Sequence, residues 1–219
     1  MNCPILLRTY KEPPFCEKEI LRYAGCRDDS GGVSELLAEC MDEVRKQLVY
    51  KVCYRELTVT ARDGICDFDS FSLESEKLCT NLAGCDKVIL FAATVGVGID
   101  RLIARYGRIS PSKALMLQAI GAERIEALCD SFCNDLAREY ETTIRPRFSP
   151  GYGDLPLDCQ KQIFALLDCE RRIGLTLGDS LLMSPTKSVT AFAGLGGKEK
   201  NNNKCGGCNS PDSSIRGNL

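Results

Sequence analysis

A short segment, 147–152, carries the side chains of this sequence best suited to binding a small polar molecule. Pro150 and the proline before Arg147 restrict the backbone and remove N–H donors, so the segment should be stiff and extended. Arg147 offers a planar guanidinium for a carboxylate, and Tyr152 offers an aromatic face with a hydroxyl. Gly151 permits a positive φ or the close approach of a flat ligand. Taken alone, such a pattern is more often a stiff loop whose arginine pairs with a neighbouring acid.

A second group of motifs follows downstream, and together with the first it favours ligand binding over a stiff loop. Residues 166–174 read Leu-Leu-Asp-Cys-Glu-Arg-Arg-Ile-Gly, and residues 177–185 read Leu-Gly-Asp-Ser-Leu-Leu-Met-Ser-Pro. With Arg147 and the Gly-Tyr pair at 151–152, this order resembles the C-terminal activation domain of cobalamin-dependent methionine synthase. That family's pattern is Arg-x-x-x-Gly-Tyr, then Leu-Leu-Asp-x-Glu-Arg, then Gly-x-x-Leu-Thr-Glu-Ser-x-x-Met-x-Pro. The resemblance is close over 140–195 and diffuse before it.

The resemblance implies a ligand, a partner and a set of contacts. The family binds S-adenosylmethionine to remethylate an oxidised cobalamin, so the ligand-binding residues here would be Arg147, Ser149, Gly151 and Tyr152. An acid from the preceding long helix would engage the ligand's charged end; Asp130, Asp135 and Glu139 lie there, and Asp135 is selected. Asp179 stands where the family has glutamate. The family's further tyrosine has no counterpart after Tyr152.

The absence of histidine from the sequence removes Ser-His-Asp and Cys-His nucleophile systems and every imidazole metal site. It also means that this chain cannot supply the histidine ligand of cobalt. Any cobalamin must therefore arrive on a partner, either a methionine synthase or another corrinoid protein.

Composition excludes other classes of function. A net charge of −2 argues against nucleic-acid binding, and no apolar run approaches the length of a membrane span. The first residues lack the apolar core and cleavage site of a signal peptide, so a cytoplasmic location is expected.

Fourteen cysteines are scattered through expected helices and strands. A chain of this length can build a core without disulfides, so most should be reduced, buried thiols. Cys205 and Cys208 form a C-x-x-C in a polar tail. They are candidates for a partial metal site or a redox pair, and the alternative is an unstructured remnant.

Hydrophobic spacing predicts an α+β domain with a mixed or antiparallel sheet flanked by helices. The run at 87–94 is continuously apolar and should be a buried central strand. A hairpin should turn at Asp63 and Gly64. The expected helices cover 17–23, 34–50, 75–82, 98–106, 110–140 and 158–167, and the other expected strands cover 51–60, 173–177, 181–183 and 188–194.

The Gly96-x-Gly98 pair follows a strand and precedes a helix, as a dinucleotide loop would. The third glycine is replaced by Arg101 and no acid follows at the required distance, which favours a tight strand-to-helix turn.

The sequence therefore predicts a globular domain over 1–196 and a flexible polar tail over 197–219. The leading hypothesis is a stand-alone reactivation subunit that binds S-adenosylmethionine. The alternative is a non-catalytic binding or assembly module of the same fold, with a degenerate ligand site and a metal- or redox-active cysteine tail. The shortened acid at Asp179 and the missing tyrosine favour the alternative.

Overall fold

The computed structural model describes residues 3–26 and 31–196. Cys205 and Cys208, and the tail predicted over 197–219, lie outside the described residues. The helices and strands follow one another in this order: β1 (Leu6–Tyr10), α1 (Glu17–Tyr23), α2 (Gly31–Arg45), β2 (Tyr50–Arg62), β3 (Ile65–Phe68), β4 (Ser72–Glu74), α3 (Glu76–Asn81), β5 (Lys87–Thr94), α4 (Gly98–Ile109), α5 (Pro111–Glu139), a 3-10 turn (Leu157–Cys159), α6 (Gln160–Leu167), α7 (Cys169–Ile173), β6 (Thr176–Leu177), β7 (Met183–Ser184) and β8 (Ser188–Leu195).

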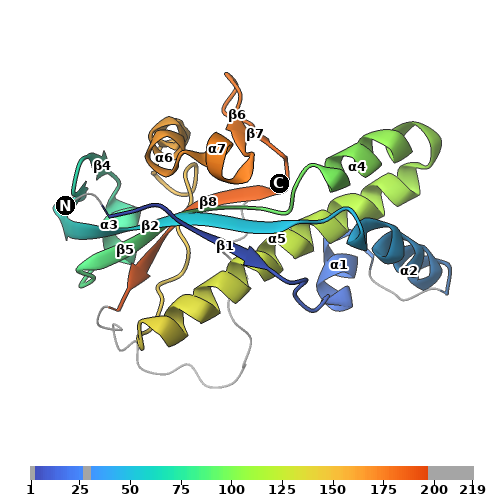
Figure 1. The fold of residues 1–219 in the computed structure, drawn as a ribbon, viewed down its shortest axis with the longest axis horizontal. Helices are drawn as coiled ribbons and strands as arrows, with labels where there is room; N and C mark the ends of the chain where they lie inside the picture. Colours follow the sequence, from blue (N-terminus) through green and yellow to red (C-terminus); the bar gives the residue numbers. More distant parts are fainter. Residues whose placement is uncertain (1–2, 27–30, 197–219) are drawn as a thin grey trace.

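The main sheet is antiparallel throughout, with the strand order β4-β3-β2-β5-β8 (Figure 1). The long strand β2 pairs with β5 along one side. On its other side it pairs with β1 near its start and with β3 near its end. The sheet was expected to be mixed or antiparallel, and the antiparallel form is the one observed.

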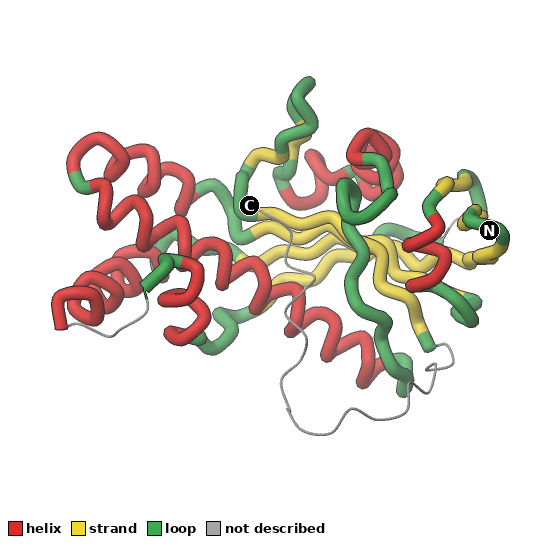
Figure 2. Tube along the Cα trace, turned by 180° about the vertical axis from the view of Figure 1, so that it is seen from behind, coloured by secondary structure: helices red, strands yellow, loops and turns green. Residues whose placement is uncertain are grey.

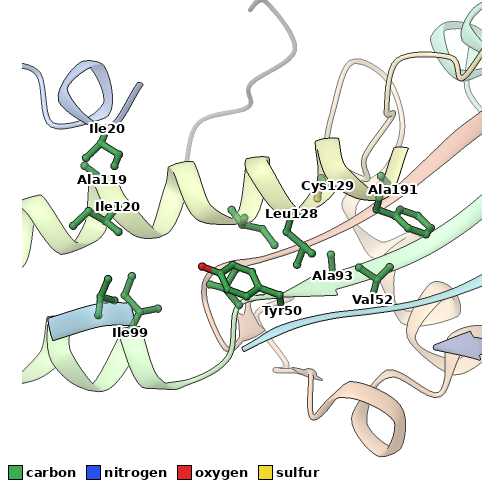
Figure 3. Packing of buried hydrophobic residues seen from close by; sticks show 14 of the residues in the cluster. Ile20, Tyr50, Val52, Ala93, Ile99, Ala119, Ile120, Leu128, Cys129 and Ala191 are labelled. Carbon is green, nitrogen blue, oxygen red and sulfur yellow. The ribbon is translucent and has the colours of Figure 1, made fainter. Parts of the chain in front are cut away.

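Two hydrophobic clusters cover the two faces of the sheet, which therefore lies between two groups of helices (Figure 2). One cluster joins the sheet to α1, α2, α4 and the long helix α5. In it, Leu128 of α5 packs close to Val52 and Ala93 of the strands (Figure 3). The other cluster joins the opposite face to α3, α6 and α7. Strand β5 contributes to both, with Phe91 on the α5 side and Leu90 on the other, as expected of a central strand.

Several predicted elements are confirmed. Strand β5 and helix α1 have the predicted bounds, and the hairpin turns at Asp63 and Gly64, both of which have positive φ. Ser75 caps α3 by accepting a hydrogen bond from the Leu78 N–H at 3.0 Å.

Other predictions were wrong. Helix α2, predicted over 34–50, begins at Gly31 and ends at Arg45. The strand predicted over 173–177 is only the two residues of β6, because the chain up to Ile173 continues as α7. Leu115 of α5 is apolar, and its helical spacing would favour burial, but it is 56% exposed. It lies in the part of α5 that extends beyond the sheet with α4 (Figure 1).

Packing against the segment between α2 and β2 explains the two glycines where α4 begins, Gly96 just before the helix and Gly98 as its first residue. Gly96 has a φ of 83°, and a Cβ there would lie 2.5 Å from Cγ2 of Val49. A Cβ on Gly98 would lie 2.2 Å from the backbone oxygen of Gln47. This pair is the tight strand-to-helix turn that the sequence favoured over a nucleotide loop.

Within 3–26 and 31–196, no helix combines the length and the apolar character that crossing a bilayer requires.

Candidate functional site

The segment before Tyr152 runs along the outer edge of β8 as a strand-like ribbon. Phe148 and Phe192 exchange two backbone hydrogen bonds of 2.9 Å each, and the Arg145 N–H donates to the Gly194 oxygen at 2.9 Å. The extended backbone that the two prolines predict is therefore observed, and the sheet edge fixes its direction.

A turn ends the ribbon at Ser149–Tyr152. The Tyr152 N–H donates to the Ser149 oxygen at 3.1 Å, and the Gly151 N–H donates to the Leu155 oxygen at 2.9 Å. Pro150 in the second position and Gly151 in the third, with a φ of 81°, are typical of a type II turn. The predicted role of Gly151 as a residue of positive φ is confirmed.

Arg147 points to helix α5, where it forms ion pairs with two acids. Its Nη2 lies 2.6 Å from Oε2 of Glu126, and its Nη1 lies 2.5 Å from Oδ1 of Asp130. Burial lowers the pKa of the guanidinium, but the neighbouring Cys129, Glu126 and Asp130 together more than compensate and raise that pKa overall. The result is a fixed cation flanked by two carboxylates at the sheet edge.

This arrangement identifies the helical acids next to Arg147. Asp130, one of the three candidates, lies at the guanidinium, whereas Asp135 pairs with Arg138 and Glu139 pairs with Arg8. Sequence reasoning missed Glu126. It lies one helical turn before Asp130 and so on the same face of α5, which was an available signal.

Two cysteines lie close to Arg147 on α5. Burial raises the pKa of both the Cys129 and the Cys133 thiols above their usual range, while the nearby guanidinium acts in the opposite direction. These thiols are therefore neutral at pH 7 and leave the two carboxylates as the charged partners of the arginine.

The next side chains of the ribbon face the other layer of the molecule. Phe148 is buried in the cluster beneath α3, α6 and α7. Its ring meets the Tyr152 ring edge-on, with 5.3 Å between the ring centroids. Tyr152 itself is 36% exposed. Arg147 and Tyr152 thus contact opposite layers, and the ribbon edge between them carries Ser149.

Helix α3 holds the ribbon in place. Asp154 accepts hydrogen bonds from the Ser75 hydroxyl and from the Glu76 N–H, the latter at 2.8 Å. The bond from Ser75 lowers the pKa of Asp154. Asn81 donates through Nδ2 to the Pro146 oxygen at 3.0 Å. A hollow of about 440 Å³ lies beside the contact of Asp154 with Ser75 and Glu76, and its lining residues are Asp63, Gly64, Ile65, Glu74, Ser75, Glu76 and Asp154.

Asp179 lies apart from these groups. It is exposed in the turn between β6 and β7, and it makes no hydrogen bond or ion pair with the residues that the structure describes. The described residues also contain no group of three or more Cys, Asp or Glu side chains placed to hold a metal ion.

Comparisons with known proteins bear on both sequence and fold. A family model described as vitamin B12 dependent methionine synthase, activation domain, matches residues 78–201, more than half of the chain. No curated protein matches the sequence. Among solved structures, the fold is similar to a crystal structure described as the MetH reactivation domain bound to AdoHcy. The TM-score is 0.66 at 15% identity, over 91% of this chain and 80% of that one. At this identity the likeness concerns the fold alone.

Proposed function

The chain belongs to the activation domain family of vitamin B12-dependent methionine synthase, and from this premise we propose that it binds S-adenosylmethionine to reactivate a partner's cobalamin. The partner is a cobalamin-binding methionine synthase or a related corrinoid protein, and this chain acts on it as a separate reactivation subunit. The observation that carries the proposal is the match of the family model to residues 78–201, which include Arg147, its two flanking acids and the turn at Gly151.

The residues at the ribbon fit the charged end of this ligand. S-adenosylmethionine carries a carboxylate and an ammonium group on its amino-acid end, and it supplies a methyl group on a sulfonium. Arg147 can hold the carboxylate, and the acids of α5 can hold the ammonium group. A guanidinium has five N–H donors, so Arg147 retains donors for a carboxylate while it contacts Glu126 and Asp130.

Ser149, Gly151 and Tyr152 are proposed to hold the rest of the ligand. The type II turn fixes the Gly151 backbone, where the absence of a side chain permits close approach. The exposed part of the Tyr152 ring offers a flat apolar surface with a hydroxyl. Asp135 and Asp179 were also selected from the sequence, but their positions give them no direct support.

The protein's contribution is positioning rather than acid–base chemistry. The sequence has no histidine, and methyl transfer from a sulfonium to reduced cobalt requires no proton transfer from the protein. The ribbon, anchored to β8 and α3, would orient the ligand, and the partner would exclude water when it docks.

Calorimetry on the full chain tests ligand binding. S-adenosylmethionine should bind to the native protein, and Arg147→Ala should weaken binding about tenfold or more because a charge-assisted carboxylate contact is lost. Arg138→Ala is the matched control: it removes the same charge from the exposed end of α5 and should leave affinity unchanged. Absence of heat with the native protein, or equal affinities for Arg147→Ala and the native protein, contradicts the proposal.

The alternative is a non-catalytic binding or assembly module with a degenerate site. The observation that favours it is that Arg147 already has two carboxylate partners without a ligand. Its predicted metal or redox centre at Cys205 and Cys208 lies outside the described residues. Metal that co-purifies stoichiometrically under anaerobic conditions, together with no binding of S-adenosylmethionine, would support this module over the reactivation subunit.

A further inference from the structure

Two thiols from different elements meet beside α3. Sγ of Cys66, on β3, lies 3.1 Å from Sγ of Cys79, on α3, and both cysteines are free thiols in this structure. Cys66 is fully buried, whereas Cys79 is half-buried and so can be reached from solvent. A disulfide needs a sulfur–sulfur distance of about 2.05 Å, so a shift of about 1 Å would bring the pair to bonding distance.

We propose that Cys66 and Cys79 form a reversible disulfide, with a low-molecular-weight disulfide of the glutathione class as the oxidant. The site is separate from the proposed ligand-binding residues, and the proposal does not depend on the ligand bound there.

The order of the exchange follows from exposure. Cys79 loses its thiol proton and attacks one sulfur of the oxidant. A mixed disulfide between Cys79 and that sulfur forms as the oxidant's S–S bond breaks, and the other half of the oxidant leaves and takes up the proton as a small thiol. Cys66 then loses its proton and attacks Sγ of Cys79, which forms the protein disulfide and releases the second small thiol. Together the two cysteines lose two electrons, and the oxidant gains them and becomes two thiols.

The surroundings of the two sulfurs support this order. Burial raises the pKa of the Cys66 thiol above its usual range, and the neighbouring Cys79 thiol raises it further, so Cys66 stays protonated until its partner has reacted. A second pair of interacting cysteines, Cys53 and Cys169, can be compared with Cys66 and Cys79. Both of these are almost completely buried, at 0% and 1% exposure, so neither can begin an exchange with a small molecule.

The disulfide would act on the ribbon through α3. The end of α3 and the turn after it hold the ribbon at two positions: Asn81, the last residue of the helix, donates to the Pro146 oxygen, and the Ala83 oxygen in the turn accepts from Arg145 at 3.1 Å. The N-terminus of α3 is bound by Asp154. A disulfide between Cys66 on β3 and Cys79 on α3 would therefore limit the motion of the segment 145–154.

Peptide mapping of the full chain tests the bond. The folded protein is treated with oxidised glutathione, its remaining thiols are blocked, and it is digested with trypsin. Cys66 lies in the peptide 63–77, while Cys79 shares the peptide 78–87 with Cys85. We expect these two peptides to appear linked, with the loss of two hydrogens. The link should persist in Cys85→Ser and vanish in Cys79→Ser and in Cys66→Ser.

Hydrogen exchange tests the effect on the ribbon. Backbone amides of 145–154 should exchange more slowly in the oxidised protein than in the reduced protein, and dithiothreitol should reverse the change. The Cys79→Ser variant should show no difference between the two conditions. The proposal is overturned if the linked peptide forms only after unfolding, if the link in the native protein joins Cys85 instead of Cys79, or if Cys79 ends as a stable mixed disulfide with glutathione.

Discussion

Nη2 of Arg147 lies 2.6 Å from Oε2 of Glu126, so the ribbon that follows α5 is tied back to the middle of that helix. The contact spans 21 residues of sequence. It sets the side of the sheet on which the guanidinium lies, while Phe148, the next residue, is buried on the other side. The ion pair therefore positions the guanidinium that is proposed to bind the ligand, and it also stabilises the fold.

Removing that cation should destabilise the fold even without ligand. Arg147→Ala leaves Glu126 and Asp130 as like charges one helical turn apart, with Glu126 about one-fifth exposed. We expect a loss of about 1–2 kcal/mol in the free energy of unfolding, intermediate between exposed and buried ion pairs. Urea denaturation measures it, and Glu126→Gln combined with Arg147→Ala should recover part of the loss. A loss in Arg138→Ala as large as in Arg147→Ala would argue against this account.

The sequence predicted elements that depend on local pattern. Strand β5 was found because the apolar run from Val88 to Ala93, bounded by turn signals, is typical of a buried strand, and α1 because its helical run is followed by a glycine. Strand β1 was missed because Leu6 and Leu7 are about half exposed and nothing in the segment alternates clearly. Its strand conformation depends on pairing with Tyr50–Tyr54, at least 40 residues away in the sequence.

The site was predictable in part for a similar reason. The stiffness of the ribbon and the turn at Gly151 are local properties of proline and glycine, and both were predicted. Among the acids that face Arg147, Asp130 was a candidate but Asp135 was selected, and Glu126 was missed, because the choice depends on where the chain after α5 returns along the helix. That return is set by the pairing of Phe148 with Phe192, which no local pattern encodes.

The cap of α3 should matter for stability. The Ser75 hydroxyl accepts from the Leu78 N–H and donates to Asp154, and the side chain is buried. Ser75→Ala should lower the free energy of unfolding by about 1 kcal/mol because a helix N–H loses its acceptor. Ser112→Ala, at an exposed position in the first turn of α5, is the control and should cause no loss. Equal stability of the two variants would show that the cap contributes nothing measurable.

Helix α4 offers two glycines with opposite expected responses to alanine. At Gly98 the new Cβ would lie 2.2 Å from the Gln47 backbone oxygen, so Gly98→Ala must shift backbone and should cost about 1–3 kcal/mol. At Gly107 nothing lies within 4 Å, so Gly107→Ala should stabilise by about 0.5–1 kcal/mol through helix propensity. Thermal unfolding of both variants checks the pair. A stabilised Gly98→Ala would contradict the tight turn described here.

Lys187, the residue just before β8, carries a buried charged group and is only 6% exposed. Its aliphatic chain packs where Gly121 of α5 leaves space, since a Cβ on Gly121 would lie 2.9 Å from two of its carbons. The nearby carboxylate of Asp100 accepts hydrogen bonds from the Thr186 N–H and hydroxyl. Burial lowers the pKa of the Lys187 amine, and the charge of Asp100 opposes this only partly.

The lowered pKa has a direct consequence for stability. Below the folded-state pKa the amine is charged in both states, and the folded state carries the cost of burying it. As pH rises from that pKa towards the usual value of about 10.4, the unfolded state binds more protons than the folded state, so the cost disappears. Lys187→Met should therefore stabilise the protein at pH 7, and this advantage over the native protein should shrink near pH 10.5. Urea denaturation at both pH values measures the difference, with Lys18→Met, at an exposed position of α1, as the control for loss of charge alone. An advantage that stays constant with pH would mean that packing, rather than the buried charge, separates Lys187→Met from the native protein.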